Sequence, residues 1–230
     1  MFYFDPTYVL ILIGVVISMA ASAKLNSTYQ RYSAVRSMCG LTGAEAAKRL
    51  LNSQGIYDVT IRRVPGSLTD HYDPRSKTVN LSDAVYGSTS IAAIGVAAHE
   101  CGHAMQDAAD YSPLRIRAAL VPAANLGSQL AWPLILVGLL LGSGGSGLAF
   151  AGIVLFSLAV LFQLVTLPVE YDASHRAVTL LDSTGILAGQ EVGQTRKVLN
   201  AAALTYVAAA AASILQLLRL LILFGNRRND

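Results

Sequence analysis

Residues 96–106 read VAAHECGHAMQ, and the centre of this stretch matches the pattern H-E-x-x-H as His99-Glu100-Cys101-Gly102-His103. The apolar run IAAIGVAA precedes it and is typical of a buried helix. On a helix His99 and His103, four residues apart, project from one face, so both imidazoles can reach one metal ion. Glu100 lies roughly 100° further around the helix, where its carboxylate can contact a water on that ion without binding the ion.

This arrangement is typical of zinc-dependent hydrolases. Zinc lowers the pKa of a bound water toward ~7, and the glutamate takes its proton as the water attacks a carbonyl. The alternative is a chance pattern, but two histidines and a glutamate are costly in an apolar core without a metal or partners. We therefore predict a metal site with Glu100 as the general base. Small Cys101 and Gly102 leave room for another element to pack closely.

The composition places the chain in a membrane. Of its 230 residues, 53% are hydrophobic and only 13% charged, and the mean hydropathy is +0.49, whereas about a quarter of the residues are charged in soluble domains. The net charge of +3 is small and the basic residues are scattered, so we predict no nucleic-acid partner. The two cysteines, Cys39 and Cys101, do not form a disulfide framework.

Four segments approach the ~20 apolar residues that cross a bilayer: Val9–Ala23, Ala118–Gly142, Leu148–Pro168 and Ala201–Phe224. A short glycine-rich turn, Ser143–Gly147, separates the second segment from the third. A cleaved signal peptide is the alternative for the first segment, but no Lys or Arg precedes Lys24 and the positive n-region is missing. We therefore predict an uncleaved anchor and a lipid bilayer as one partner.

The basic residues predict an orientation. Eleven of the seventeen Lys and Arg lie between Lys24 and Arg117, and the Ser143–Gly147 turn has none. The positive-inside rule then puts the long loop and Val169–Asn200 in the cytoplasm. Arg227 and Arg228 oppose this assignment, because a fourth span would place them outside. Either the last segment is not a simple span, or the chain does not follow the positive-inside rule at its C-terminus. In either case two spans separate the long loop from Val169–Asn200, and both segments share a side.

The long loop shows the signals of a small α+β unit. Thr42-Gly43-Ala44-Glu45 predicts a capping box for a helix that Gly55 ends, and Ser88 or Thr89 is placed to cap the motif helix. Between them, residues 56–64 and 78–81 read as hairpin-like strands, with a turn-rich stretch at 70–75.

A catalytic zinc needs a third protein ligand. His71 and His175 are the other histidines, and Glu170 follows Pro168 in what reads as the first turn of a helix, where it can point back at a metal. Glu170 and His175 are roughly 140° apart on a helix, so one ion cannot take both. Asp172 and Arg176, at i and i+4, are expected to pair with each other or to bond to groups around the metal.

Two stretches carry a family resemblance. DHYDPRSKTVNLSDAVYGSTSIAAIGVAAHECGHAMQ and the later LPVEYDASHRA resemble the YugP-type family of neutral zinc metallopeptidases of bacterial membranes. The resemblance implies one zinc per chain on His99, His103 and Glu170, with Glu100 as the base. Relatives of that family with a downstream glutamate have an aspartate four residues after it; this chain has Ser174 there.

We predict a mainly α fold: a multi-span membrane helix bundle with a small zincin-like α+β unit inserted between the first two spans. The expected parts are an anchor helix (1–23), a cytoplasmic zincin-like unit (24–117), a transmembrane hairpin (118–168), a cytoplasmic helical segment with the third ligand (169–200), and a last transmembrane helix and tail (201–230).

The predicted activity is hydrolysis of peptide bonds, in peptides or membrane proteins, at the cytoplasmic surface of the cell membrane. The substrate is expected to pair with the strand around Thr78–Leu81. An intramembrane protease, with the motif helix in lipid, is one alternative, but its apolar run is short. A non-catalytic metal-binding scaffold is the other, although structural zinc needs no base such as Glu100.

Overall fold

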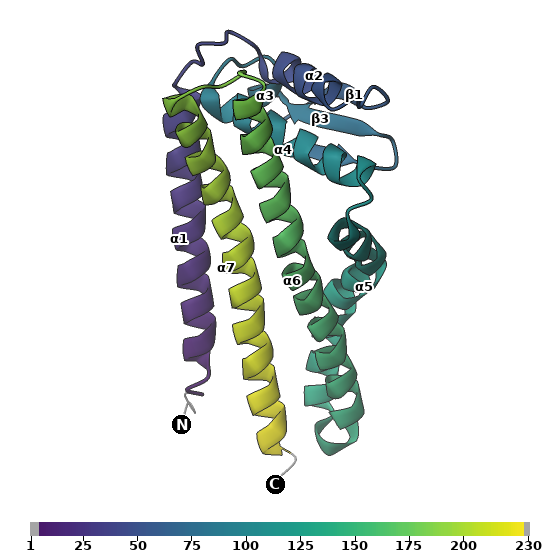
Figure 1. Cartoon of the computed structure of the whole chain (residues 1–230). Coiled ribbons are helices and arrows are strands. Elements are labelled where there is room, and N and C mark those ends of the chain that lie inside the picture. The colour runs from purple at the N-terminus through teal and green to yellow at the C-terminus, as the bar shows by residue number, and fades with distance from the viewer. Residues whose placement is uncertain (1–4, 228–230) are drawn as a thin grey trace. The chain divides into compact units, whose positions relative to one another are not determined.

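The computed structural model describes residues 5–227. The predicted N-terminal anchor and C-terminal tail also include residues 1–4 and 228–230, which lie outside the described residues. The elements, labelled in Figure 1 where there is room, are α1 (Tyr8–Ser33), α2 (Gly43–Ser53), β1 (Thr60–Val64), β2 (His71–Asp73), β3 (Thr78–Ser82), α3 (Asp83–Tyr86), α4 (Ile91–Ala108), α5 (Ser112–Leu140), the 3-10 helix η1 (Gly142–Gly145), α6 (Ser146–Ser183) and α7 (Gln190–Arg227). The predicted fold class is confirmed: the chain is mainly helical, with a small sheet between the first and second long apolar helices.

The chain forms two compact units. The membrane unit comprises Met1–Ala21, Arg115–Leu167 and Thr205–Asp230, and the site unit comprises Ser22–Leu114 and Pro168–Leu204. The site unit is therefore built from two segments of the chain, because residues 168–204 belong to it together with the loop that follows the first span.

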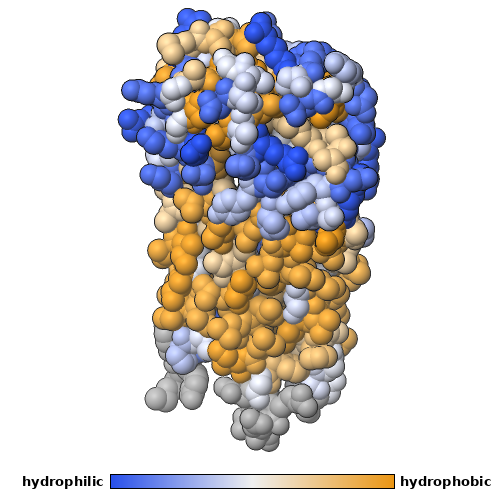
Figure 2. Space-filling model, in the orientation of Figure 1, coloured by the Kyte–Doolittle hydropathy of each residue, from blue (hydrophilic) through white to orange (hydrophobic). Residues whose placement is uncertain are grey.

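Four helices of the described chain are long and apolar enough to cross a bilayer: α1, α5, α6 and α7. Much of their apolar surface is exposed; Val16 and Met19 on α1, for example, are 64% and 66% exposed. Figure 2 shows hydrophobic side chains covering the visible face of the membrane unit, whereas hydrophilic side chains are frequent on the site unit. Contiguous apolar surface of this extent marks a contact with a membrane or another protein, and helices of this length suit a bilayer.

Small residues let the membrane helices pack closely. A Cβ at Gly138 of α5 would overlap the backbone of Ala149 of α6, so these two helices approach with almost no side chain between them. Ile135, Ile153 and Leu220 form a small core that joins α5, α6 and α7. An ion pair lies in this unit, where Arg219 of α7 is 3.3 Å from the Asp5 carboxylate.

The site unit has its own hydrophobic core, made by α2, α4 and the buried face of the sheet. The predicted capping box is present: the Thr42 hydroxyl accepts from the Glu45 backbone N–H at 3.2 Å, and the Glu45 carboxylate accepts from the Thr42 N–H at 2.8 Å. It starts α2, whose buried Leu50 and Leu51 belong to the core. These contacts support the motif helix α4 from one side.

The sheet differs from the predicted hairpin. Its strand order is β1-β3-β2, with β1 parallel and β2 antiparallel to β3. The turn-rich stretch contains β2, because the actual turn comes later: the Asp73 carboxylate accepts from the Arg75 N–H at 3.0 Å and from the Ser76 hydroxyl at 2.6 Å. The hairpin is therefore β2–β3, and β1 reaches the far side of β3 by a crossover.

The cap of the motif helix also differs from the prediction. Ser90, not Ser88 or Thr89, is the N-cap of α4, and its hydroxyl accepts from the Ala93 N–H at 3.2 Å. The reason is tertiary, because Arg36 forms a β-bridge with Ser90 and the Ser37 N–H bonds to the Thr89 carbonyl. This pairing keeps the chain extended until Ser90.

Pro168 does not end the third span. α6 continues through it to Ser183, so Glu170 lies inside a 38-residue helix and not in a first turn. Proline removes a single N–H donor, and long apolar helices tolerate that loss. The consequence is that one helix runs from the membrane unit into the site unit and delivers Glu170 there.

Candidate metal centre

The candidate site lies where α4 and α6 touch within the site unit. A Cβ at Gly102 would overlap the carbonyl oxygen of Ala173, so the two backbones are in contact at this point. Cys101 points elsewhere: it is fully buried, and its Sγ is 3.6 Å from the Ala47 carbonyl oxygen of α2. The prediction that small residues at 101 and 102 admit another element is thus confirmed on both sides of α4.

Close packing brings three ligand-type side chains together. The Glu170 Oε2 is 3.2 Å from His99 Nε2 and 3.6 Å from His103 Nε2. One donor atom from each residue lies within 4.8 Å of the others, and no other such His, Cys, Asp or Glu group is found in the described chain. Two imidazole nitrogens and one carboxylate are the ligand set of a catalytic zinc that keeps one open position.

The hydrogen bonds of Gln106 determine the tautomer of His103. The Gln106 Nε2 donates at 2.8 Å to two groups that only accept, the Val169 carbonyl and the Asp172 carboxylate. Its Oε1 therefore faces His103 Nδ1 at 3.0 Å, and that nitrogen must be the donor. In the neutral ring this leaves a lone pair on Nε2, the atom that faces Glu170.

Asp172 is held in turn by Arg176. The Arg176 Nε donates to the Asp172 Oδ2 at 2.6 Å, as the i, i+4 spacing predicts. The carboxylate thus accepts from both Arg176 and Gln106, and it supports His103 through the glutamine. Such outer contacts orient metal-binding histidines and raise their basicity.

Ser174 plays the corresponding part for His99. Its hydroxyl is 3.1 Å from His99 Nδ1, on the side of the ring opposite to the nitrogen that faces Glu170. The serine found in place of the expected aspartate therefore still contacts a motif histidine, as a neutral partner in place of a charged one. Both histidines present Nε2 to the same carboxylate.

The cluster is unfavourable without a cation. A neutral His103 would aim a lone pair at the Glu170 carboxylate, so the pair needs either a proton or a metal ion between them. Burial alone lowers the pKa of His103, but the hydrogen bond that the protonated ring donates to Glu170, with the charges of Glu100 and Glu170 and the contact to Gln106, raises it above its usual value. The site therefore attracts positive charge, as a divalent metal would supply.

Glu100 is next to His99 in the chain, and its carboxylate is not bonded to any other described residue. The residue is only 7% exposed, and among the described residues its side chain has no hydrogen bond or ion pair. Its oxygens are not among the fully buried unpaired polar atoms of the described residues, so they remain accessible to a molecule the size of water. A water molecule held between the carboxylate and a metal is the partner that this position suits.

The other sequence candidates lie outside the cluster. The exposed His71 contacts the Thr69 carbonyl and the Asn80 amide, and His175 lines a pocket of about 360 Å³ together with Arg196 and Ser174. Burial raises the pKa of the Cys101 thiol, which keeps it protonated and unsuited to bind a metal.

Gln106 is the residue that the sequence reading missed, although its place three residues after His103 was a usable signal.

Replacing Ser174 tests the support of His99. We expect Ser174→Ala to lower zinc affinity by about 10- to 100-fold, the usual cost of losing a group that orients a ligand. Ser183→Ala, on the same helix but bonded only to the Leu180 carbonyl, is the matched control and should leave affinity unchanged. Competition with a chromogenic chelator measures both. Equal affinities for Ser174→Ala and the parent would show that the contact does not matter.

The fold and the site together define a class: a multi-span membrane protein that carries a His-His-Glu cluster of the kind that binds zinc in peptidases. A family model described as "Putative neutral zinc metallopeptidase" matches residues 7–225, and the chain belongs to this family. The chain is also similar to "Putative membrane protease YugP" of Bacillus subtilis (strain 168), with 48% identity over 214 residues, 93% of this chain and 94% of that protein. No solved structure was found to match the chain.

Proposed function

We propose that the protein is a membrane-embedded zinc endopeptidase that binds one zinc through His99, His103 and Glu170. The observation that carries the proposal is the convergence of these three side chains on one point, beside a buried Glu100 without a protein partner. Membership of a zinc metallopeptidase family supports the same reaction. The direct test compares the purified parent with its Glu100→Gln variant on an unfolded protein substrate, before and after zinc removal.

The residues divide the work of peptide hydrolysis. A bound zinc supplies a Lewis acid and lowers the pKa of a coordinated water to about 7. The Glu100 carboxylate accepts a proton from the attacking water and then delivers it to the leaving amine, so that one peptide bond and one water yield a carboxylate and an amine. Gln106 and Ser174 keep the Nδ1 atoms of the histidines engaged and their Nε2 atoms available.

The prediction that β3 binds the substrate is wrong. Residues Thr78–Ser82 form the central strand, with β1 hydrogen-bonded on one side and β2 on the other. In the described sheet the strands with a free edge are β1 and β2, so an extended substrate can add only there. We propose β2, because Tyr72 of β2 is joined to the motif helix by its hydroxyl, 2.9 Å from the Asp107 carboxylate.

The structure favours this reading over intramembrane proteolysis. α4, which carries the motif, is not among the four candidate spans of the described chain. It packs instead on α2, α3 and the sheet, and Gln106 and Asp107 are among its buried residues. A non-catalytic scaffold would give no role to the Glu100 carboxylate, which has no hydrogen bond or ion pair among the described residues. Hydrolysis next to the membrane therefore fits better than either alternative.

The proposed orientation places the site unit in the cytoplasm. The test is cysteine labelling in intact cells, with single cysteines placed at Arg75 in the turn after β2 and at Gly144 in η1, where the backbone is exposed and a side chain meets nothing within 4 Å. An impermeant maleimide is expected to label position 144 and to leave position 75 unlabelled until the cells are opened. Because the native cysteines could react, Cys39 and Cys101 are first changed to Ser and Ala. The opposite labelling pattern would place the site unit outside.

A further inference from the structure

A cationic pocket of about 520 Å³ lies in the site unit, between α1 and α7. Its charged lining residues are Lys24 and Arg31 of α1 and Lys197 of α7, and no Asp or Glu lines it. The neutral polar groups of Thr28 and Asn200 line it as well. The pocket shares no lining residue with the metal cluster, so it needs a separate explanation.

None of the three cations has an ion pair with a carboxylate among the described residues, whereas some other cations of this unit do. Those ion pairs are Arg63 with Asp83, Lys77 with Asp58 and Asp107, and Arg176 with Asp172. Among the described residues, neither Lys24 nor Lys197 has an ion pair, and the recorded contact of the Arg31 guanidinium is with the ring of Tyr32 at 5.6 Å. Like charges around one pocket repel each other unless an anion lies between them.

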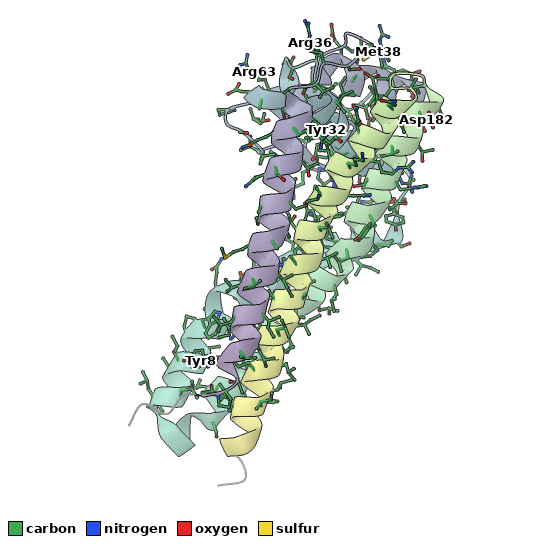
Figure 3. The ribbon with its side chains drawn as sticks, turned by 90° about the vertical axis from the view of Figure 1, so that its left-hand side faces the viewer. Tyr8, Tyr32, Arg36, Met38, Arg63 and Asp182 are labelled. Carbon is green, nitrogen blue, oxygen red and sulfur yellow. The ribbon has the colours of Figure 1, made fainter. Side chains whose placement is uncertain are left out.

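The pocket lies where the apolar runs of α1 and α7 end, which is where a membrane-spanning helix reaches the membrane surface. Lys24 directly follows the apolar run Val9–Ala23 within the continuous helix α1, and Asn200 directly precedes the apolar run Ala201–Phe224 within α7. At 1.5 Å per residue, Arg31 lies only about 10 Å beyond Lys24 along α1. The headgroup layer on each side of a bilayer is roughly 5–8 Å thick. The end of the pocket at Lys24 is therefore expected to lie in the headgroup layer. Figure 3 shows Tyr8 and Tyr32 near the two ends of α1. Tyr32 is next to Arg31 in the chain and also lines the pocket.

We propose that this pocket binds the phosphate of an anionic phospholipid headgroup. Arg31 can hold two phosphate oxygens at once, and the two lysines supply point charges around them. The neutral donors Thr28 and Asn200 complete the site. Leu204, an exposed apolar residue of the same lining, continues it into the apolar part of α7, which suits the glycerol and acyl portion of a lipid better than a free phosphate.

The test measures lipid binding to the full chain in a neutral detergent. Short-chain phosphatidylglycerol and phosphatidylcholine are titrated and bound lipid is counted by native mass spectrometry. We expect the parent to bind phosphatidylglycerol much more tightly than phosphatidylcholine. The triple variant Lys24→Gln, Arg31→Gln, Lys197→Gln should lose at least ~10-fold in affinity, since each surface cation contributes on the order of five-fold before salt screening.

A charge-matched control separates a site from general attraction. The triple variant Lys48→Gln, Arg49→Gln, Arg62→Gln removes the same charge from exposed positions outside the pocket and should bind phosphatidylglycerol as the parent does. Equal losses in both triple variants would overturn the proposal. Displacement of the lipid by inorganic phosphate at similar concentration would assign the pocket to a soluble phosphate ligand instead. Lipid binding by the parent and the two triple variants is measured with no peptide substrate present, so its outcome is independent of the proposed peptidase activity.

Discussion

Changing Glu100 to Gln is expected to lower peptide hydrolysis by at least ~100-fold, the scale of general-base catalysis. The amide keeps the shape of the side chain but cannot accept the proton of the attacking water. Since Glu100 is not one of the three converging ligands, the zinc content of the variant should equal that of the parent. Cleavage of casein by purified protein, read together with metal analysis, measures both properties.

Glu191→Gln is the matched control for this change. Glu191 is buried to nearly the same degree as Glu100, 8% against 7% exposed, but it lies in the first turn of α7 and accepts from the Met38 N–H. A glutamine can still accept that bond, so activity should stay within about two-fold of the parent, as for a change that leaves the reacting groups in place. A chelator should abolish parent activity and added zinc restore it. Cleavage by Glu100→Gln at the parent rate would assign the activity to another site or a contaminant.

Removal of either motif histidine is expected to abolish zinc binding. His99→Ala and His103→Ala each delete a nitrogen ligand and leave the Glu170 carboxylate facing a single imidazole. Glu170→Ala should retain some zinc, because both histidines remain oriented by Ser174 and Gln106. Metal analysis after dialysis against a weak chelator ranks the variants, and circular dichroism confirms that each one remains folded.

His175→Ala is the control for the third ligand. His175 lies five residues after Glu170 on the same helix and is not one of the three converging side chains, so its removal should leave the zinc content unchanged. The two variants thus distinguish between the sequence candidates directly. If His175→Ala strips the metal and Glu170→Ala does not, the assignment of Glu170 as the third ligand is wrong.

Several features of this protein could be predicted from local sequence. The four apolar runs predict the spans, because about 20 apolar residues are needed to cross a bilayer wherever they occur. The Thr42–Glu45 capping box predicts the start of α2, since both partners lie within one helical turn. The spacing of His99 and His103 predicts a shared face, because the helix itself imposes that geometry. In each case the interacting residues are close in the chain.

Some predictions were wrong where contacts between segments far apart in the chain determine the local structure. Ser90 became the N-cap because Thr89 and Ser90 pair with Ser37 and Arg36, and the edge position of β2 depends on a crossover that no local pattern records. Pro168 did not end α6 either, because an internal proline removes only one N–H donor from the helix.

By itself the sequence determined the membrane class of this protein, the helix that carries H-E-x-x-H and the short set of candidates for a third ligand. Only the tertiary structure brings one of those candidates to the motif histidines, because Gly102 lets α6 contact α4 and this contact places Glu170 within 3.2 Å of His99. It also decided the roles of Gln106 and Ser174, whose bonds to the Nδ1 atoms depend on that same packing. Helix periodicity acts over a few residues, whereas a metal site formed by residues 71 positions apart depends on how two helices pack.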